Sequence, residues 1–225
     1  SHFGGKTDLS ISSKQIDTLI MTLANANTSD DAYNEYAPSQ PNNTIRRQNL
    51  KLYLEAMVER MPQTMMVMEA PGYRGCRLTG VPVTSRKVML EGVPELDMFG
   101  EDRGYRNVDE AGFEKIYGEQ SATIVWGTLA DLKVVPFIWN TFPFHPHKKG
   151  KPLTNRKPRK PETRLGGEIL QQVIDLWQFK RIIAIGNVAF DTMTEFDIDC
   201  VKVRHPAQGG KNDFVAGLTS IFTTS

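Results

Sequence analysis

Four short apolar runs set the fold that this sequence can adopt. They cover residues 64–68, 133–139, 181–185 and 199–203. Each run has the length of a buried strand, and stretches with helical periodicity separate them. Pro136 has no N–H to donate to a sheet, so pairing in the second run is expected to begin at Phe137. Strands that alternate with helices predict an α/β fold: a three-layer αβα sandwich around a central, mostly parallel four-stranded sheet.

The clearest helix is expected over residues 163–177, where apolar residues recur at helical spacing. These residues are Ile169, Leu170, Val173, Leu176 and Trp177. Earlier helices are expected from a cap at Ser12 or Ser13 and from near Thr44 to Pro62.

A further helix is expected from Ser121, as its cap, through Leu129, whereas residues 25–43 are expected to form a loop. The length suits one domain over residues 1–225. We expect an N-terminal helical part at 1–62 and a sheet core with the active site at 63–225.

Composition excludes several classes of protein. Two cysteines, Cys76 and Cys200, are too few for the four thiolates of a zinc or iron–sulfur site. No apolar run approaches the roughly 20 residues of a membrane-spanning helix, and the first residues lack the apolar stretch of a signal peptide. Ser1-His2-Phe3 lacks an initiator Met, so no function is assigned to His2. We expect a cytoplasmic monomer without a cofactor, associated with the nucleoid if the source is bacterial.

Charge is strongly segregated along the chain. The basic segment, residues 148–164, holds eight basic residues and one acidic residue, whereas residues 91–120 hold nine acidic and three basic ones. A basic run is often a solvated loop, but it also suits a surface that pairs with phosphates.

Polar or turn residues follow three of the predicted strands. Glu69-Ala70-Pro71-Gly72 follows the first, Asn140 the second and His205-Pro206 the last. The carboxyl ends of parallel strands share one edge of a sheet, where ligands bind. The sequence therefore predicts one site at this edge.

With these motifs the sequence resembles the uracil-DNA glycosylase superfamily, in particular its iron–sulfur branch. The resemblance spans residues 64–218 and rests on five motifs in order: Met68-Glu69-Ala70-Pro71-Gly72 with Gly80-Val81-Pro82-Val83, then Asn140, Asn155-Arg156 with Pro161-Glu162, residues 182–189, and His205-Pro206-Ala207. It implies a uracil-DNA glycosylase-like fold and a monofunctional enzyme that removes uracil from DNA to initiate base-excision repair.

The sequence also departs from that branch. Its cysteines are too few for the cluster, and Val83 stands where the family has an aromatic residue that stacks on the flipped base. Stacking would then come from Phe142 or Tyr73, or be weaker. Ala70 replaces the Asp that activates water in the best-known branch. The resemblance thus implies a divergent branch without a cluster.

The resemblance also implies roles for particular residues. His205 would donate a hydrogen bond to the leaving base, and Asn140 would read uracil through its amide. Glu69 is the nearest carboxylate for activating water, but a structural role is equally compatible with its position. Contacts with base and sugar are expected from Ala70, Pro71, Gly72, Tyr73, Val83 and Phe142.

Uracil-containing DNA is the implied partner. Lys148, Lys149, Lys151 and Arg156 would hold phosphates. The tail Gln208-Gly209-Gly210-Lys211-Asn212 matches the loop that fills the gap left by the flipped base, with Gln208 or Asn212 in the gap. His145 and His147 lack a third ligand nearby, so no metal site is predicted.

Two other functions remain compatible with the sequence. One is a glycosylase of the same fold for another deaminated base, such as hypoxanthine. The other is a DNA-binding protein that has lost turnover, which Ala70 and Val83 suggest.

Overall fold

The computed structural model describes residues 10–224, so His2 lies outside the described part. Its centre is a sheet of four parallel strands in the order β3-β2-β5-β6. The strands are β2 (Thr64–Met68), β3 (Phe137–Asn140), β5 (Arg181–Ile185) and β6 (Val201–Val203). The predicted α/β class and the four-stranded sheet are confirmed, and β3 begins at Phe137 as expected, directly after Pro136.

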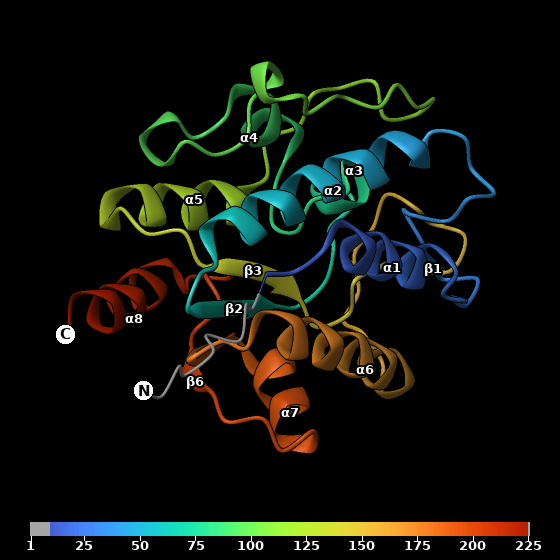
Figure 1. The fold of residues 1–225 in the computed structure, drawn as a ribbon. Helices are drawn as coiled ribbons and strands as arrows, with labels where there is room; N and C mark the ends of the chain where they lie inside the picture. The colour runs from blue at the N-terminus through green and yellow to red at the C-terminus, as the bar shows by residue number, and fades with distance from the viewer. Residues whose placement is uncertain (1–9, 225) are drawn as a thin grey trace, which may run out of the picture.

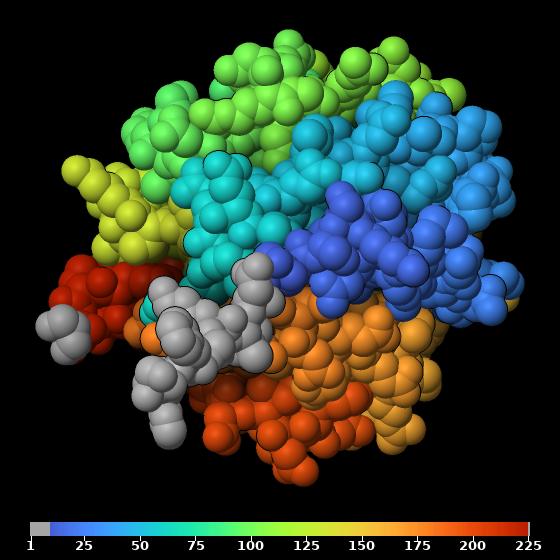
Figure 2. Space-filling model, in the orientation of Figure 1, coloured from blue at the N-terminus to red at the C-terminus, as the bar shows by residue number. Residues whose placement is uncertain are grey.

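Helices cover both faces of the sheet, in keeping with a three-layer sandwich (Figure 1). In the view of Figure 1, α2 (Asn43–Arg60) and α5 (Gln120–Leu132) lie above the sheet, and α6 (Lys160–Trp177) and α7 (Asn187–Glu195) lie below it. On the face shown in Figure 2, α1 (Ser13–Ala24) lies between α2 and α6 and contacts both. The last helix, α8 (Lys211–Thr223), packs against β6 and α5.

Short elements connect β2 with α5: α3 (Cys76–Thr79), α4 (Arg86–Glu91) and two 3-10 turns, Pro94–Leu96 and Glu101–Arg103. Within residues 10–224, no helix combines the length and the apolar character needed to cross a membrane.

Local capping explains where two helices begin. Ser12 caps α1, and Gln15 completes a capping box with it. The expectation that Ser121 caps α5 was wrong, because Glu119 is the cap and its carboxylate accepts hydrogen bonds from the N–H groups of Ser121 and Ala122. A carboxylate suits this position because the N-terminus of a helix carries unpaired donors and partial positive charge.

A small second sheet ties the N-terminal part to the segment after β3. β1 (Ala32–Tyr33) lies within the predicted loop 25–43 and pairs antiparallel with β4 (His145–Pro146). Arg156 strengthens this connection, because it forms ion pairs with Glu162 at 2.7 Å and with Asp31 at 3.2 Å. These two ion pairs therefore fix the basic segment to the rest of the protein at Arg156.

Glu35 lies fully buried beside the sheet edge that holds the predicted site. Its Oε1 lies 3.8 Å from the thiol of Cys76, and its Oε2 has no partner within residues 10–224. Burial raises the pKa of Glu35 to about 8, although Arg46 and Arg77 oppose this. At neutral pH the carboxyl group is therefore protonated.

This burial predicts a pH-dependent stability. Between pH 6.5 and 8 the folded state keeps the Glu35 proton that the unfolded state releases, so the free energy of unfolding falls as pH rises, by about 2 kcal/mol. Burial also raises the pKa values of Cys76 and Tyr36, which stay neutral over this interval. His145 and His205, whose pKa values are lowered, make the free energy of unfolding rise over the same interval, but they do so equally in the parent and in Glu35→Gln. Urea unfolding at the two pH values should therefore show that the parent loses about this amount relative to Glu35→Gln. An equal change in both proteins would contradict the assignment.

Candidate active site

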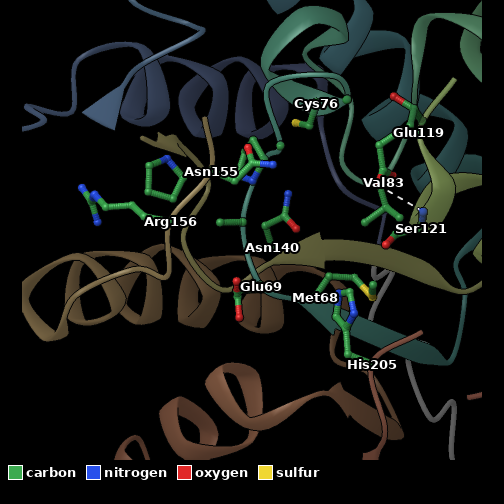
Figure 3. A pocket seen from close by; sticks show the side chains of 16 residues that line it. Met68, Glu69, Cys76, Val83, Glu119, Ser121, Asn140, Asn155, Arg156 and His205 are labelled. Atoms are coloured by element: carbon green, nitrogen blue, oxygen red, sulfur yellow. Dashed lines mark hydrogen bonds between the residues drawn. The ribbon is translucent and has the colours of Figure 1, made fainter. Parts of the chain in front are cut away.

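A cavity of about 170 Å³ opens at the carboxyl edge of the sheet (Figure 3). A water molecule needs only roughly 10–15 Å³, so the cavity can hold a ligand of several heavy atoms. The strand order places it well: the chain leaves β2 first toward β3 and later returns to β5 on its other side, which creates a crevice at this edge. Predicted site residues on its wall are Glu69, Ala70, Pro71, Gly72, Val83, Asn140, Arg156 and His205.

His205 follows β6 by two residues, and its ring extends toward Met68 in the cavity (Figure 3). The backbone N–H of Ala207 donates to His205 Nδ1 at 3.0 Å. Because Nδ1 is an acceptor there, the proton of the neutral ring lies on Nε2. Burial lowers the pKa of His205 from its ordinary value of 6.5, so the ring is neutral at pH 7 and presents an N–H donor.

Two glycines make this position of His205 possible. Gly186 has a φ of +87°, and a Cβ there would lie 3.2 Å from the Cβ of His205. A Cβ on Gly210 would lie 2.0 Å from the carbonyl oxygen of His205. Larger residues at either place would displace the imidazole.

Asn140 is the last residue of β3 and pairs in register with Met68 at the end of β2. The pairing continues beyond the strands, because the N–H of Thr141 donates to Met68 O at 2.9 Å and that of Phe142 to Glu69 O at 3.0 Å. Asn140 is 3% exposed, and within residues 10–224 its side-chain amide forms no hydrogen bond. A buried amide without a protein partner is available to a ligand.

The motif turn, residues 69–72, forms another part of the wall. Glu69 is half-buried, and burial raises the pKa of its carboxyl group while Lys157 opposes the rise. A carboxylate whose pKa moves toward neutrality is better matched to accepting a proton near pH 7.

Val83 provides a rigid apolar patch on the wall. It adopts a left-handed backbone conformation with a φ of +53°, which is unfavourable for a β-branched residue. Trp126 holds it there, since its indole N–H donates to Val83 O at 2.8 Å. Phe142 and Tyr73 do not line the cavity: the Phe142 ring is buried against Phe144, and the Arg74 guanidinium lies over the Tyr73 ring.

Sequence reasoning missed other residues on the wall, among them Glu119, Ser121 and Cys76, and it quoted Asn155 without assigning it a role. Glu119 could have been identified as an acidic residue just before a helix. Cys76 carries no comparable signal. Burial raises its pKa, so it is present as a thiol rather than a reactive thiolate.

The predicted DNA-binding residues fall into two groups. Lys148, Lys149 and Lys151 lie exposed on a tight turn and form no ion pair within residues 10–224. Arg156 is instead held by Glu162 and Asp31 and is mostly buried.

The tail after His205 differs from the expected loop. Gln208 and Gly209 are exposed and Gly210 is buried, but Lys211 and Asn212 already belong to the first turn of α8. Helix α8 therefore shortens the loop available to enter a duplex.

A second cavity of about 700 Å³ adjoins the first, and both are lined by Glu69 and His205. Three cationic residues lie on its wall: Lys157, Lys202 and Arg204. Gln208 lines it as well. Lys157 belongs to the basic segment that was predicted to contact phosphates, whereas Lys202 and Arg204 were not among the predicted DNA-binding residues.

No group of three metal-ligating side chains occurs among residues 10–224. His145 and His147 instead form hydrogen bonds with the carbonyl oxygens of Thr154 and Lys148.

Comparison with known proteins identifies no family: no family model matches the chain, and no curated protein matches it. Fold and cavity define an α/β protein with a polar cavity at the carboxyl edge of a parallel sheet.

Proposed function

We propose that this protein is a monofunctional uracil-DNA glycosylase of a divergent branch without an iron–sulfur cluster. The observation that carries the proposal is the pairing of two unengaged groups on one cavity wall: the Asn140 amide and the Nε2–H of neutral His205. Both residues come from the motifs that resemble the superfamily, and both follow strands of the same parallel sheet.

The Asn140 amide can distinguish uracil from cytosine. Uracil presents N3–H and O4 on its Watson–Crick edge, whereas cytosine presents N3 and an amino group. An amide offers one acceptor and a donor group, which match uracil. The base reaches the cavity only when it is flipped out of the duplex, and Val83 then forms an apolar wall beside it.

The His205 imidazole stabilises the leaving group. When the N-glycosidic bond breaks, its electron pair remains on uracil, and negative charge spreads onto O2. The Nε2–H of His205 donates to that oxygen, while water adds to C1′ of the sugar and loses a proton. Glu69 accepts that proton or orients the water, and its raised pKa favours this role.

The absence of a lysine from the described wall of the first cavity supports a monofunctional reaction. A lysine nucleophile would be needed to form a Schiff base with the sugar. In the proposed reaction water is the nucleophile, and the product is an abasic site.

The exposed turn that carries Lys148, Lys149 and Lys151, here called the basic turn, should hold the DNA backbone. Replacing Lys148, Lys149 and Lys151 together with Gln should weaken binding to duplex DNA of any sequence. The slope of log K against log salt should fall by up to about 0.9 for each phosphate that the variant no longer neutralises. Fluorescence anisotropy at several salt concentrations measures this slope.

The control replaces three other exposed lysines with Gln: Lys14, Lys133 and Lys180. Two of these precede strands and so lie toward the opposite edge of the sheet. If both triple variants change the slope equally, the basic turn is only a solvated loop.

The direct test is incubation with a uracil-containing oligonucleotide followed by alkaline cleavage of abasic sites. The proposal requires cleavage with the parent protein and its loss in His205→Ala. Oligonucleotides that contain hypoxanthine test the alternative base. Tight DNA binding without abasic product would support a binding protein that has lost turnover.

A further inference from the structure

Asn155 lies at the rim of the first cavity, between the basic turn and α6. In Figure 3 it lies on the side of Asn140 that is farther from His205. The three side chains thus follow one another along the wall in the order His205, Asn140, Asn155. Arg156, held by Glu162 and Asp31, fixes the chain directly after Asn155.

Two contacts determine how the Asn155 amide is oriented. The backbone N–H of Tyr73 donates to Asn155 Oδ1 at 2.9 Å. The Nε2 atom of His145 lies 3.3 Å from the same oxygen and 2.9 Å from Thr154 O. A carbonyl oxygen can only accept, so His145 Nε2 carries the proton and donates to both oxygens. Both contacts therefore assign Oδ1 as the acceptor.

The NH₂ group of Asn155 is consequently left as a donor without a hydrogen-bond partner within residues 10–224. His145 is fully buried, and burial lowers its pKa to about 4, so the ring is neutral and its Nε2 proton is kept at pH 7. The orientation of the Asn155 amide is thus fixed before any ligand binds.

Around a uracil ring the groups that these side chains would contact follow one another in a matching order: O2, then N3, then O4. If His205 contacts O2 and Asn140 contacts N3 and O4, position 5 is the next ring atom beyond C4, away from His205. Asn155 lies in that direction. A Cβ on Gly72 would lie 3.7 Å from Asn155 Oδ1 and 3.8 Å from Nδ2, so the lack of a side chain at Gly72 leaves this space beside the amide open.

We propose that Asn155 is a specificity-determining residue that reads position 5 of the base and donates to an oxygen carried there. The inference rests on the proposed function and extends it to pyrimidines oxidised at C5, of which 5-formyluracil and 5-hydroxymethyluracil are probes. His145 and the N–H of Tyr73 act as positioning groups, because they reach the base only through Asn155.

The test compares uracil, 5-formyluracil and 5-hydroxymethyluracil in single-stranded oligonucleotides, where unstacking from a duplex does not contribute. Single-turnover excision rates are measured for the parent and for Asn155→Asp. The carboxylate keeps an acceptor for Tyr73 and His145 but has no donor. A formyl oxygen only accepts, whereas a hydroxymethyl group can donate to the carboxylate.

We expect the parent to excise all three bases. In Asn155→Asp the ratio of 5-formyluracil to uracil rates should fall about 10-fold, as expected when the exposed Asn155 amide loses the one hydrogen bond that it donates to the formyl oxygen. The ratio for 5-hydroxymethyluracil should change less than about 3-fold. Each ratio is compared with the same ratio for the parent, so that differences in intrinsic reactivity between the bases cancel. Asn27→Asp adds the same charge at an exposed position that lines neither cavity and should leave both ratios unchanged.

Three results would overturn the inference. An equal loss on all bases in Asn155→Asp would mean that Asn155 only holds the Tyr73 backbone. A parent that excises uracil but rejects 5-formyluracil would show that position 5 does not face this amide. A parent inactive on uracil would overturn the proposed function, and this inference with it.

Discussion

Replacing His205 with Ala is expected to lower the single-turnover rate of uracil excision by about 10²- to 10³-fold, the usual cost of losing a preorganised donor to a developing anion. The effect should be large because the donor is held in one tautomer by Ala207 and lies in a partly buried site. Rapid-quench measurement on a single-stranded substrate isolates this step from binding to a duplex.

His205→Gln is the matched variant, because its amide keeps a donor at nearly the same reach but on a flexible side chain without the ring. We expect it to be intermediate between the parent and the Ala variant, with circular dichroism and DNA affinity unchanged in both. A rate for the Ala variant within about 3-fold of the parent, far from the expected loss, would remove His205 from the reaction.

Asn140→Asp is expected to show the second largest effect, a loss of uracil excision of about 10- to 100-fold, since a good bidentate base contact contributes about 1–3 kcal/mol of discrimination. The side chain is 3% exposed, so an ionised carboxylate would be poorly solvated there. Its protonated form can donate to N3 of cytosine and accept from the amino group. The variant should therefore excise cytosine weakly, which a cytosine-containing oligonucleotide measures.

Asn140→Ala removes the amide without introducing a carboxyl group that could pair with cytosine. It should lose uracil excision to a similar extent without any activity on cytosine. If Asn140→Asp retains the parent rate on uracil, Asn140 does not contact the base.

The sheet could be predicted because its strands are buried on both faces. β2 and β5 read as nearly continuous apolar runs, and parallel pairing then brings the residues after each strand to one edge. Asn140 and His205 therefore meet on one wall although 65 positions separate them in sequence.

Features that depend on a distant partner could not be predicted. The salt bridge between Arg156 and Asp31 depends on β1, which brings Asp31 beside it, and no local sequence pattern predicts a two-residue strand. Glu119 competes with Ser121 for the cap of α5, and the two differ only in which side chain reaches the free N–H groups. The orientation of Asn155 depends on His145 and Tyr73, which lie in other segments.

The strand order has a consequence for how the molecule folds. The central strand β2 pairs with β5 through partners as far apart as Thr64 and Arg181, and β6 supplies the last pairing. Contacts this distant in sequence slow folding, because long loops must close before the contacts form. During synthesis the edge of β2 that later pairs with β5 is therefore exposed for a time. An unpaired strand edge of this kind can aggregate or bind chaperones. His205 follows β6, the last strand of this sheet along the chain, so the cavity is completed only after all four strands have been made.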